Sequence, residues 1–254
     1  MTGALVRAEL RWDMRAFEAK LSAAERRQMP YAMALALNET ARGGRAAVQK
    51  EMDRVFDRPT PYAKRGVVYD KATRDAPVAA VVLTGDRTRG GLPATAFLGP
   101  QVEGGRRTLK AFERQLQDRG MLPSGRVVVP AARTKLDRYG NIPQSFLNRV
   151  MADLQINYRG AGAERARTDR SLKRNRNYRS ARFFVPGTGS HLAPGIYQRV
   201  PGSREVFPVL LFVEARAYAV RLRFHDVVRE HAARHFARNF TEAFAKAMRT
   251  ARPR

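Results

Sequence analysis

Two histidines near the C-terminus have the spacing of a helical metal site. His231 and His235 stand four residues apart, which places both imidazoles on one face of an α-helix. A zincin site also needs a glutamate directly after the first histidine, and Ala232 occupies that position. Phe236 and Phe240 beside the pair favour a packed or interfacial location. We therefore predict that the chain holds no metal and no cofactor.

A glycine-rich segment from Gly187 to His191 could bring backbone amides close to an anion. It lacks the third glycine of a dinucleotide fingerprint and the Gly-Lys-Ser/Thr ending of a P-loop, which favours a hairpin-like connection. No serine lies in a Gly-x-Ser-x-Gly elbow, no paired acidic motif of the nuclease type stands out, and the chain has no cysteine. We therefore expect a protein that is not an enzyme and has no catalytic residues.

The strongest binding candidate in the composition is the basic stretch of residues 159–182. It carries nine arginines and lysines against Glu164 and Asp169, and Tyr158 and Tyr178 bracket much of it. Such a loop can hold phosphates through arginine forks while a tyrosine stacks on a base. The alternative, which we favour, is an insertion that orders only against a neighbouring subunit. The predicted DNA or partner contacts are Arg165, Arg167, Arg170, Lys173, Arg174, Arg176 and Arg179.

Hydrophobic spacing predicts the elements that must position these residues. An apolar stripe predicts a long helix from Pro30 to Val55, with the pair Gly43-Gly44 as a kink or break. Further predicted helices cover residues 108–116, 143–158 and 224–249, and predicted strands cover residues 4–12, 77–83, 94–98, 183–185 and 206–213.

This order of elements predicts an α+β fold with a small, mainly antiparallel sheet. A long N-terminal helix and a long C-terminal helix flank the sheet. We expect one domain over residues 1–254, with residues 120–182 as a loop-rich insertion within it. The hydrophobic content of 44% is enough for a packed core.

The last predicted helix carries apolar residues at strict four-residue intervals. They are Phe224, Val228, Ala232, Phe236, Phe240, Phe244 and Met248. A four-residue repeat drifts around a straight helix, because one turn contains 3.6 residues. The stripe should therefore face more than one neighbour. We predict that part of it is core and that Phe236, Phe240 and Phe244 form an assembly interface.

The charge of the chain is strongly basic. Its 48 lysines and arginines exceed its 23 aspartates and glutamates, for a net charge of +25 and a pI near 11.4. Such a surface attracts DNA or an acidic protein, although a GC-rich genome would also enrich arginine through mutational bias. No run of about 18 apolar residues is present, so we expect a soluble chain made in a cytoplasm, with no membrane partner.

Three motifs in a fixed order resemble one family of virion proteins. They are Phe97–Arg107, Leu136–Asn141 and Leu192–Arg199, each rich in turn-forming residues. With a long helix before them and another after, they resemble tailed-bacteriophage structural proteins of the minor tail, tail-completion or neck type, related to minor tail protein Z. The resemblance covers the chain from about Pro30 to Arg249.

The resemblance implies a part of a virion and no reaction. It implies a ring of six or twelve copies at the junction of head and tail. The ring would contact portal or adaptor proteins and tail proteins, and it would be within reach of the phage genome DNA. Before assembly the protein would be in the host cytoplasm. The alternative is a sequence-independent DNA-binding protein that uses its arginine-rich surface.

Overall fold

The computed structural model describes residues 6–11, 22–85, 92–154, 182–187, 189–200 and 203–250. Helices and antiparallel sheets make up these residues, which confirms the predicted α+β class and the long helix toward each end of the chain. The basic residues from Arg165 to Arg179 lie outside the described residues, so the predicted DNA or partner contacts stay a prediction.

The chain divides into two compact units. Unit 1 contains residues 1–107 and 218–254, and unit 2 contains Thr108–Ala217. The sequence analysis expected one domain with an insertion over residues 120–182. The structure differs because the strands after residue 182 pair with a strand near residue 128, so they belong to the inserted unit. The inserted part is therefore longer than expected and has its own sheet and core.

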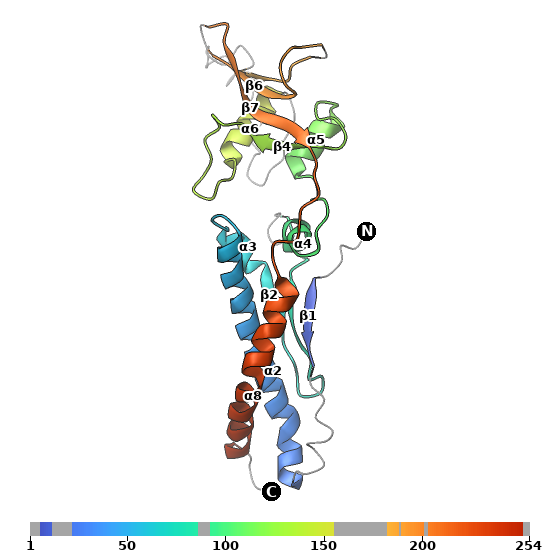
Figure 1. Cartoon of the computed structure of the whole chain (residues 1–254), viewed down its shortest axis with the longest axis vertical. Helices are drawn as coiled ribbons and strands as arrows, with labels where there is room; N and C mark the ends of the chain where they lie inside the picture. Colours follow the sequence, from blue (N-terminus) through green and yellow to red (C-terminus); the bar gives the residue numbers. More distant parts are fainter. Residues whose placement is uncertain are drawn as a thin grey trace, which may run out of the picture. The chain divides into compact units, whose positions relative to one another are not determined.

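Unit 1 consists of two long helices against a three-stranded sheet (Figure 1). Its elements are β1 (Arg7–Leu10), α2 (Ala23–Val55), α3 (Pro61–Arg65), β2 (Val67–Asp70), β3 (Ala79–Leu83), α4 (Ala94–Glu103) and α8 (Phe224–Arg249). The strand order is β1-β3-β2, and both pairings are antiparallel. Helices α2 and α8 lie side by side and pack extensively.

Helix α2 begins about two turns before the predicted start at Pro30 because a capping box fixes its first turn. The Ser22 hydroxyl accepts from the Glu25 N–H at 3.3 Å, and the Glu25 carboxylate accepts from the Ser22 N–H at 2.8 Å. Pro30 lies inside the helix and is exposed. The reciprocal cap satisfies two amides that would otherwise lack partners.

The pair Gly43-Gly44 does not break α2, so the predicted break is wrong. The helix is continuous over 33 residues, and Gly43 lets α8 approach closely. A Cβ added at Gly43 would lie 2.3 Å from Nε2 of His231, whereas one at Gly44 would lie 3.7 Å from Cγ1 of Val228. Gly43 therefore makes room for the His231 ring, and Gly44 has ordinary van der Waals space.

This geometry predicts opposite outcomes for two neighbouring alanine substitutions. Alanine is the better helix former, so Gly44→Ala should stabilise the protein by up to about 1 kcal/mol. Gly43→Ala should lose that gain because its methyl displaces His231, and should regain it in a His231→Ala background. Urea unfolding of the four variants measures the difference. An equal effect of Gly43→Ala in both backgrounds would contradict the contact.

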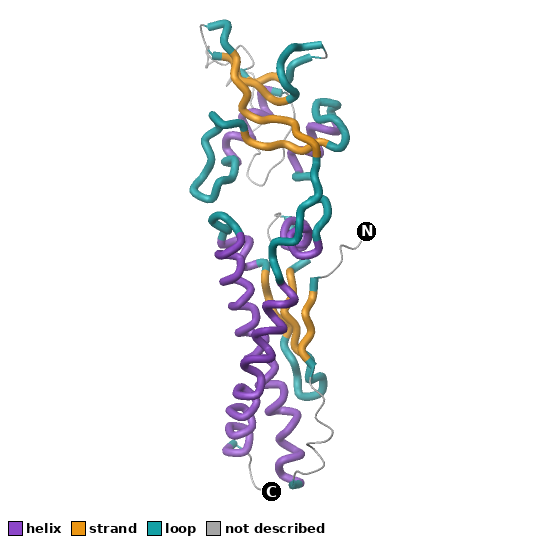
Figure 2. The backbone as a smooth tube through the Cα atoms, viewed as in Figure 1, coloured by secondary structure: helices purple, strands orange, loops and turns teal. Residues whose placement is uncertain are grey.

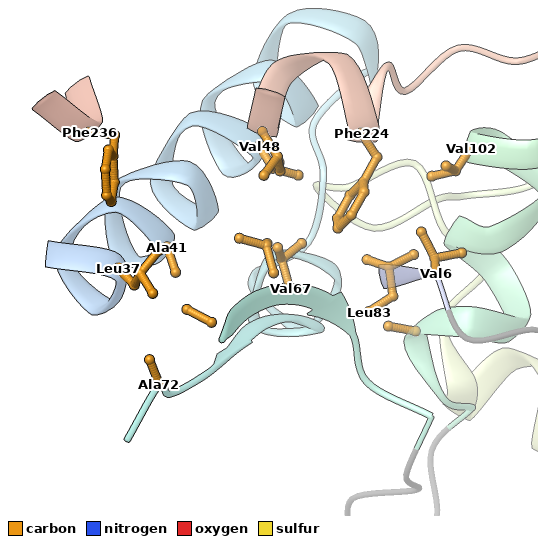
Figure 3. Packing of buried hydrophobic residues seen from close by; sticks show 14 of the residues in the cluster. Val6, Leu37, Ala41, Val48, Val67, Ala72, Leu83, Val102, Phe224 and Phe236 are labelled. Carbon is orange, nitrogen blue, oxygen red and sulfur yellow. The ribbon is translucent and has the colours of Figure 1, made fainter. Parts of the chain in front are cut away.

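The core of unit 1 lies between the helix pair and the sheet (Figure 3). Val48 of α2 and Phe224 of α8 point toward Val67 and Leu83 of the strands. A buried polar contact joins the two helices, where the Asn239 amide donates to the Thr40 hydroxyl at 3.0 Å. Both side chains are buried, and a buried polar group without a hydrogen-bond partner destabilises the fold. The contact therefore favours one register of the two helices.

Residues 94–98 form the start of helix α4, so the strand predicted there is wrong. Ala94, Leu98 and Val102 are the buried residues of α4, at intervals of four, which is helical spacing. A short, mainly apolar run such as this one does not distinguish a strand from a buried helix segment by periodicity. A Cβ added at Gly66 would lie 2.4 Å from Cβ of Ala94, so a glycine is needed where this helix packs.

The described residues of unit 2 form a four-stranded antiparallel sheet with two helices (Figure 2). Its elements are α5 (Ala111–Asp118), β4 (Arg126–Pro130), α6 (Gln144–Asp153), β5 (Phe183–Phe184), β6 (Gly195–Arg199) and β7 (Val206–Glu214). The strand order is β4-β7-β6-β5. Its core includes Phe112 and Leu116 of α5, Val150 of α6, and Ile196 and Leu210 of the sheet.

Strand β6 lies in a segment that the sequence analysis treated as a connection. Pro194 and Gly195 at its start and Arg199 at its end hide the short apolar run between them. Gly195 pairs with Leu211, and a Cβ at Gly195 would lie 2.4 Å from the Leu210 carbonyl oxygen. The glycine is thus required by a close backbone approach between β6 and β7.

Candidate assembly interface

The aromatic residues of α8 form a continuous column. The ring centroids of Phe236 and Phe240 lie 6.1 Å apart, and those of Phe240 and Phe244 lie 5.9 Å apart, with interplanar angles of 23° and 21°. Phe236 is buried, with 5% of its surface exposed, whereas Phe240 and Phe244 are half-buried. The column therefore begins in the core of unit 1 and ends at its surface.

The drift of a four-residue repeat explains this change in burial. Toward the C-terminal end of α8 the buried positions are Asn239, Ala243 and Ala247. Each lies one residue before a member of the four-residue apolar repeat. A step of four residues rotates the side chain by about 40° around the helix. Phe236, which the sequence analysis predicted at the interface together with Phe240 and Phe244, lies instead in the core of unit 1. An interface role for Phe240 and Phe244 stays a prediction.

His231 and His235 lie on the same helix and contact each other. Their ring centroids are 4.4 Å apart, and the Arg238 guanidinium lies 3.5 Å from Nδ1 of His235. Burial, and then the nearby His235, Arg234 and Arg238, lower the pKa of His231 below its ordinary value of 6.5. In the described part of the chain, no group of three or more His, Cys, Asp or Glu side chains could hold a metal ion.

Arginines of unit 2 stack on aromatic rings, which the sequence analysis missed. The Cζ atom of Arg199 lies 4.1 Å from the centroid of Phe184, and that of Arg133 lies 5.2 Å from Phe207. Arg149 and Arg138 lie over Phe146 and Tyr139 in the same way. Two of these four pairs, Arg199 with Phe184 and Arg133 with Phe207, are far apart in sequence, so no local pattern could have revealed them.

In unit 1, Arg221 stacks on Phe56 in the same way, with its Cζ atom 5.5 Å from the ring centroid, whereas arginines on α2 pair with carboxylates. Arg42 and Arg54 on α2 contact Glu39 and Glu51, each at 2.5 Å and three residues away. These carboxylates neutralise part of the positive charge on the helix surface. A ring does not neutralise the charge of the arginine that stacks on it, and the edge of a stacked guanidinium can donate to a phosphate.

The three sequence motifs all form turns or strand pairings. In the first, Gly104 and Gly105 have φ values of 77° and 94°, and Gly105 exchanges backbone hydrogen bonds with Tyr218 at 2.7 and 3.2 Å. In the second, the Asp137 carboxylate accepts from the amides of Tyr139 and Asn141 at 2.8 and 2.9 Å. The third contains β6. Each motif therefore has a structural role in its own unit.

Comparison with protein-family models, with curated proteins and with solved structures finds no match to this chain. The family resemblance consequently rests on the three motifs and the helices around them. Among the helices that the structure describes, none is both long enough and apolar enough to cross a membrane.

Proposed function

We propose that this protein is a structural component of the head-tail joint of a tailed bacteriophage and forms a ring of six or twelve copies. The observation that carries the proposal is the aromatic column of α8, whose last two rings, Phe240 and Phe244, are half-buried in the single chain. Half-buried stacked aromatics are typical anchors of protein interfaces. A head-to-tail contact closes into a ring when its rotation permits.

The order of the three motifs supports the same proposal. Their turns and pairings give the motifs structural roles in both units, as expected for a family defined by a shared fold and assembly. Under this proposal the protein joins portal or adaptor proteins to tail proteins and performs no reaction.

The proposal is tested by locating the chain in the virion. A reconstruction of particles from the phage that encodes it should show a ring of this protein around the channel between head and tail. A matched particle preparation, labelled with an antibody against the protein, identifies the density independently. A single asymmetric copy, or particles that lack the protein, would refute the proposal.

The second candidate is a sequence-independent DNA-binding protein. The observation in its favour is the set of ring-stacked arginines in unit 2, together with the net charge of +25. Each lost phosphate contact lowers the slope of log affinity against log salt by about 0.9. The substitutions for this test are Arg170→Gln, Lys173→Gln, Arg174→Gln and Arg176→Gln, combined in one variant.

Binding of that variant to a DNA duplex of mixed sequence should have a salt slope lower by up to about 3.6 units, which corresponds to four lost contacts. The control variant combines Arg42→Gln and Arg54→Gln, which remove charges that already have carboxylate partners. An unchanged slope in the fourfold variant would assign the basic segment to a protein interface instead of DNA.

A further inference from the structure

Unit 1 contains an open groove of about 460 Å³ along the edge strand β1. One wall is the run of residues from Arg7 to Arg11, and the other is one face of α8 between His225 and Phe236. Leu37 and Thr40 of α2 contribute to the floor. The groove thus lies between a strand and a helix, and β1 is labelled at the margin of unit 1 in Figure 1.

The backbone of β1 presents hydrogen-bonding groups to this groove. The Leu83 N–H donates to the Val6 carbonyl at 3.1 Å, which sets the alternation of the antiparallel pair β1-β3. Ala8 therefore faces β3, whereas the N–H and C=O groups of Arg7 and Glu9 point to the outer edge. Within the described part of the chain, these outward groups have no backbone partner.

The two walls of the groove are similar in length. The lining residues of α8 span eleven helical steps, or about 16 Å. The four backbone steps from Arg7 to Arg11 span about 13 Å when extended. Between them, the partly exposed Ala8, Leu10 and Ala232 supply apolar surface, whereas Leu37, Val228 and Phe236 are almost fully buried. This combination of an unpaired strand edge and an apolar floor fits one added strand whose alternate side chains point inward.

The rim of the groove is basic. Its lining includes three arginines, Arg7, Arg11 and Arg229, and one acidic residue, Glu9. Glu9 contacts Arg7 at 3.0 Å and Arg11 at 2.8 Å, and Arg229 contacts Asp226 at 3.0 Å. The side chains of Arg11 and Arg229 nevertheless remain 70% and 75% exposed, so both keep donors for a further carboxylate.

We propose that this groove binds an extended, acidic segment of a partner protein. The segment adds to β1 as a strand, places apolar side chains toward Leu10 and Ala232 at alternate positions, and directs carboxylates to Arg11 and Arg229. The net charge of +25 favours an acidic partner over a neutral one. This site is separate from the proposed ring contacts, because Phe240 and Phe244 do not line the groove.

The test uses a blocked, fluorescein-labelled heptapeptide in which glutamate and valine alternate. Its binding to the full chain is measured by fluorescence polarisation, with two variants at one position. Glu9→Pro removes the outward N–H while the β1-β3 ladder keeps its hydrogen bonds, and Glu9→Ala is the matched control that also lacks the carboxylate. Loss of one hydrogen bond should weaken binding to the proline variant about fivefold relative to the alanine variant.

Two further peptides keep the test independent of how well a variant folds. N-methylation at alternate residues blocks strand pairing, and should abolish binding to the unmodified protein. Lysine in place of each glutamate should abolish it too, because the rim is basic.

The proposal is overturned if the glutamate-valine peptide does not bind, if the proline and alanine variants bind it equally, or if the lysine peptide binds as well. Self-association that Glu9→Pro removes and Glu9→Ala keeps, without peptide binding, would assign the groove to a second copy of the chain and also overturn it.

Discussion

Replacing Phe236 with alanine should unfold unit 1 at much lower denaturant concentration, whereas the same change at Phe244 should leave folding nearly intact. Phe236 is 5% exposed and belongs to the core cluster of unit 1, so its loss leaves a cavity. Truncation of a buried phenylalanine costs about 3–5 kcal/mol of unfolding free energy. Phe244 is half-buried at the end of the column, and its truncation should cost about 1 kcal/mol.

The assembly assay should rank these residues differently. If Phe244 anchors a neighbouring subunit, then Phe244→Ala should give folded protein while phage production stops at heads and tails that do not join. Ala245→Ser, at an exposed position next to it, is the control and should give normal particles. Complementation of a phage that lacks the gene, with electron microscopy of the products, measures the outcome. Normal particles from a Phe240→Ala and Phe244→Ala double variant would contradict the interface.

Replacing Glu113 with alanine should destabilise unit 2 by about 2–5 kcal/mol, because it leaves a buried and a partly buried amide without their acceptor. Glu113 is fully buried on α5. Its carboxylate accepts from the Lys110 N–H at 2.7 Å and from the Val128 N–H at 2.8 Å. The first bond caps α5, and the second satisfies an outward amide of the edge strand β4. One side chain therefore joins the helix to the sheet.

A graded set of variants separates the hydrogen bonds from the volume of the side chain. Glu113→Gln keeps the volume and one acceptor oxygen but turns an NH₂ group toward the other amide, so its cost should be intermediate. Glu214→Ala removes an exposed carboxylate from the same unit and should have little effect. Hydrogen exchange of the β4 amides measures the change within unit 2. Equal exchange in wild type and Glu113→Ala would show that the carboxylate does not hold the strand.

Elements with a strong local pattern could be predicted from the sequence. Helix α8 has the predicted bounds of residues 224–249, and β7 begins at the predicted Val206, since helical spacing and a long apolar run identify such elements. The strand predicted at residues 94–98, where the structure has the start of α4, was wrong because the apolar run there is short. The predicted contact residues from Arg165 to Arg179 lie outside the described residues, so their role remains a prediction.

The sequence by itself determined the α+β class, the two long helices and the aromatic ladder, because each depends on residues that are neighbours along the chain. Only the tertiary structure decided that Gly43 receives the His231 ring, that Glu113 serves two amides, and that the ladder is buried at Phe236 but surface-facing at Phe244. These contacts join segments up to 188 residues apart, as between Gly43 and His231. Local periodicity contains no information on which distant surface a side chain meets. Helix packing and strand pairing decide which segments of the chain come together.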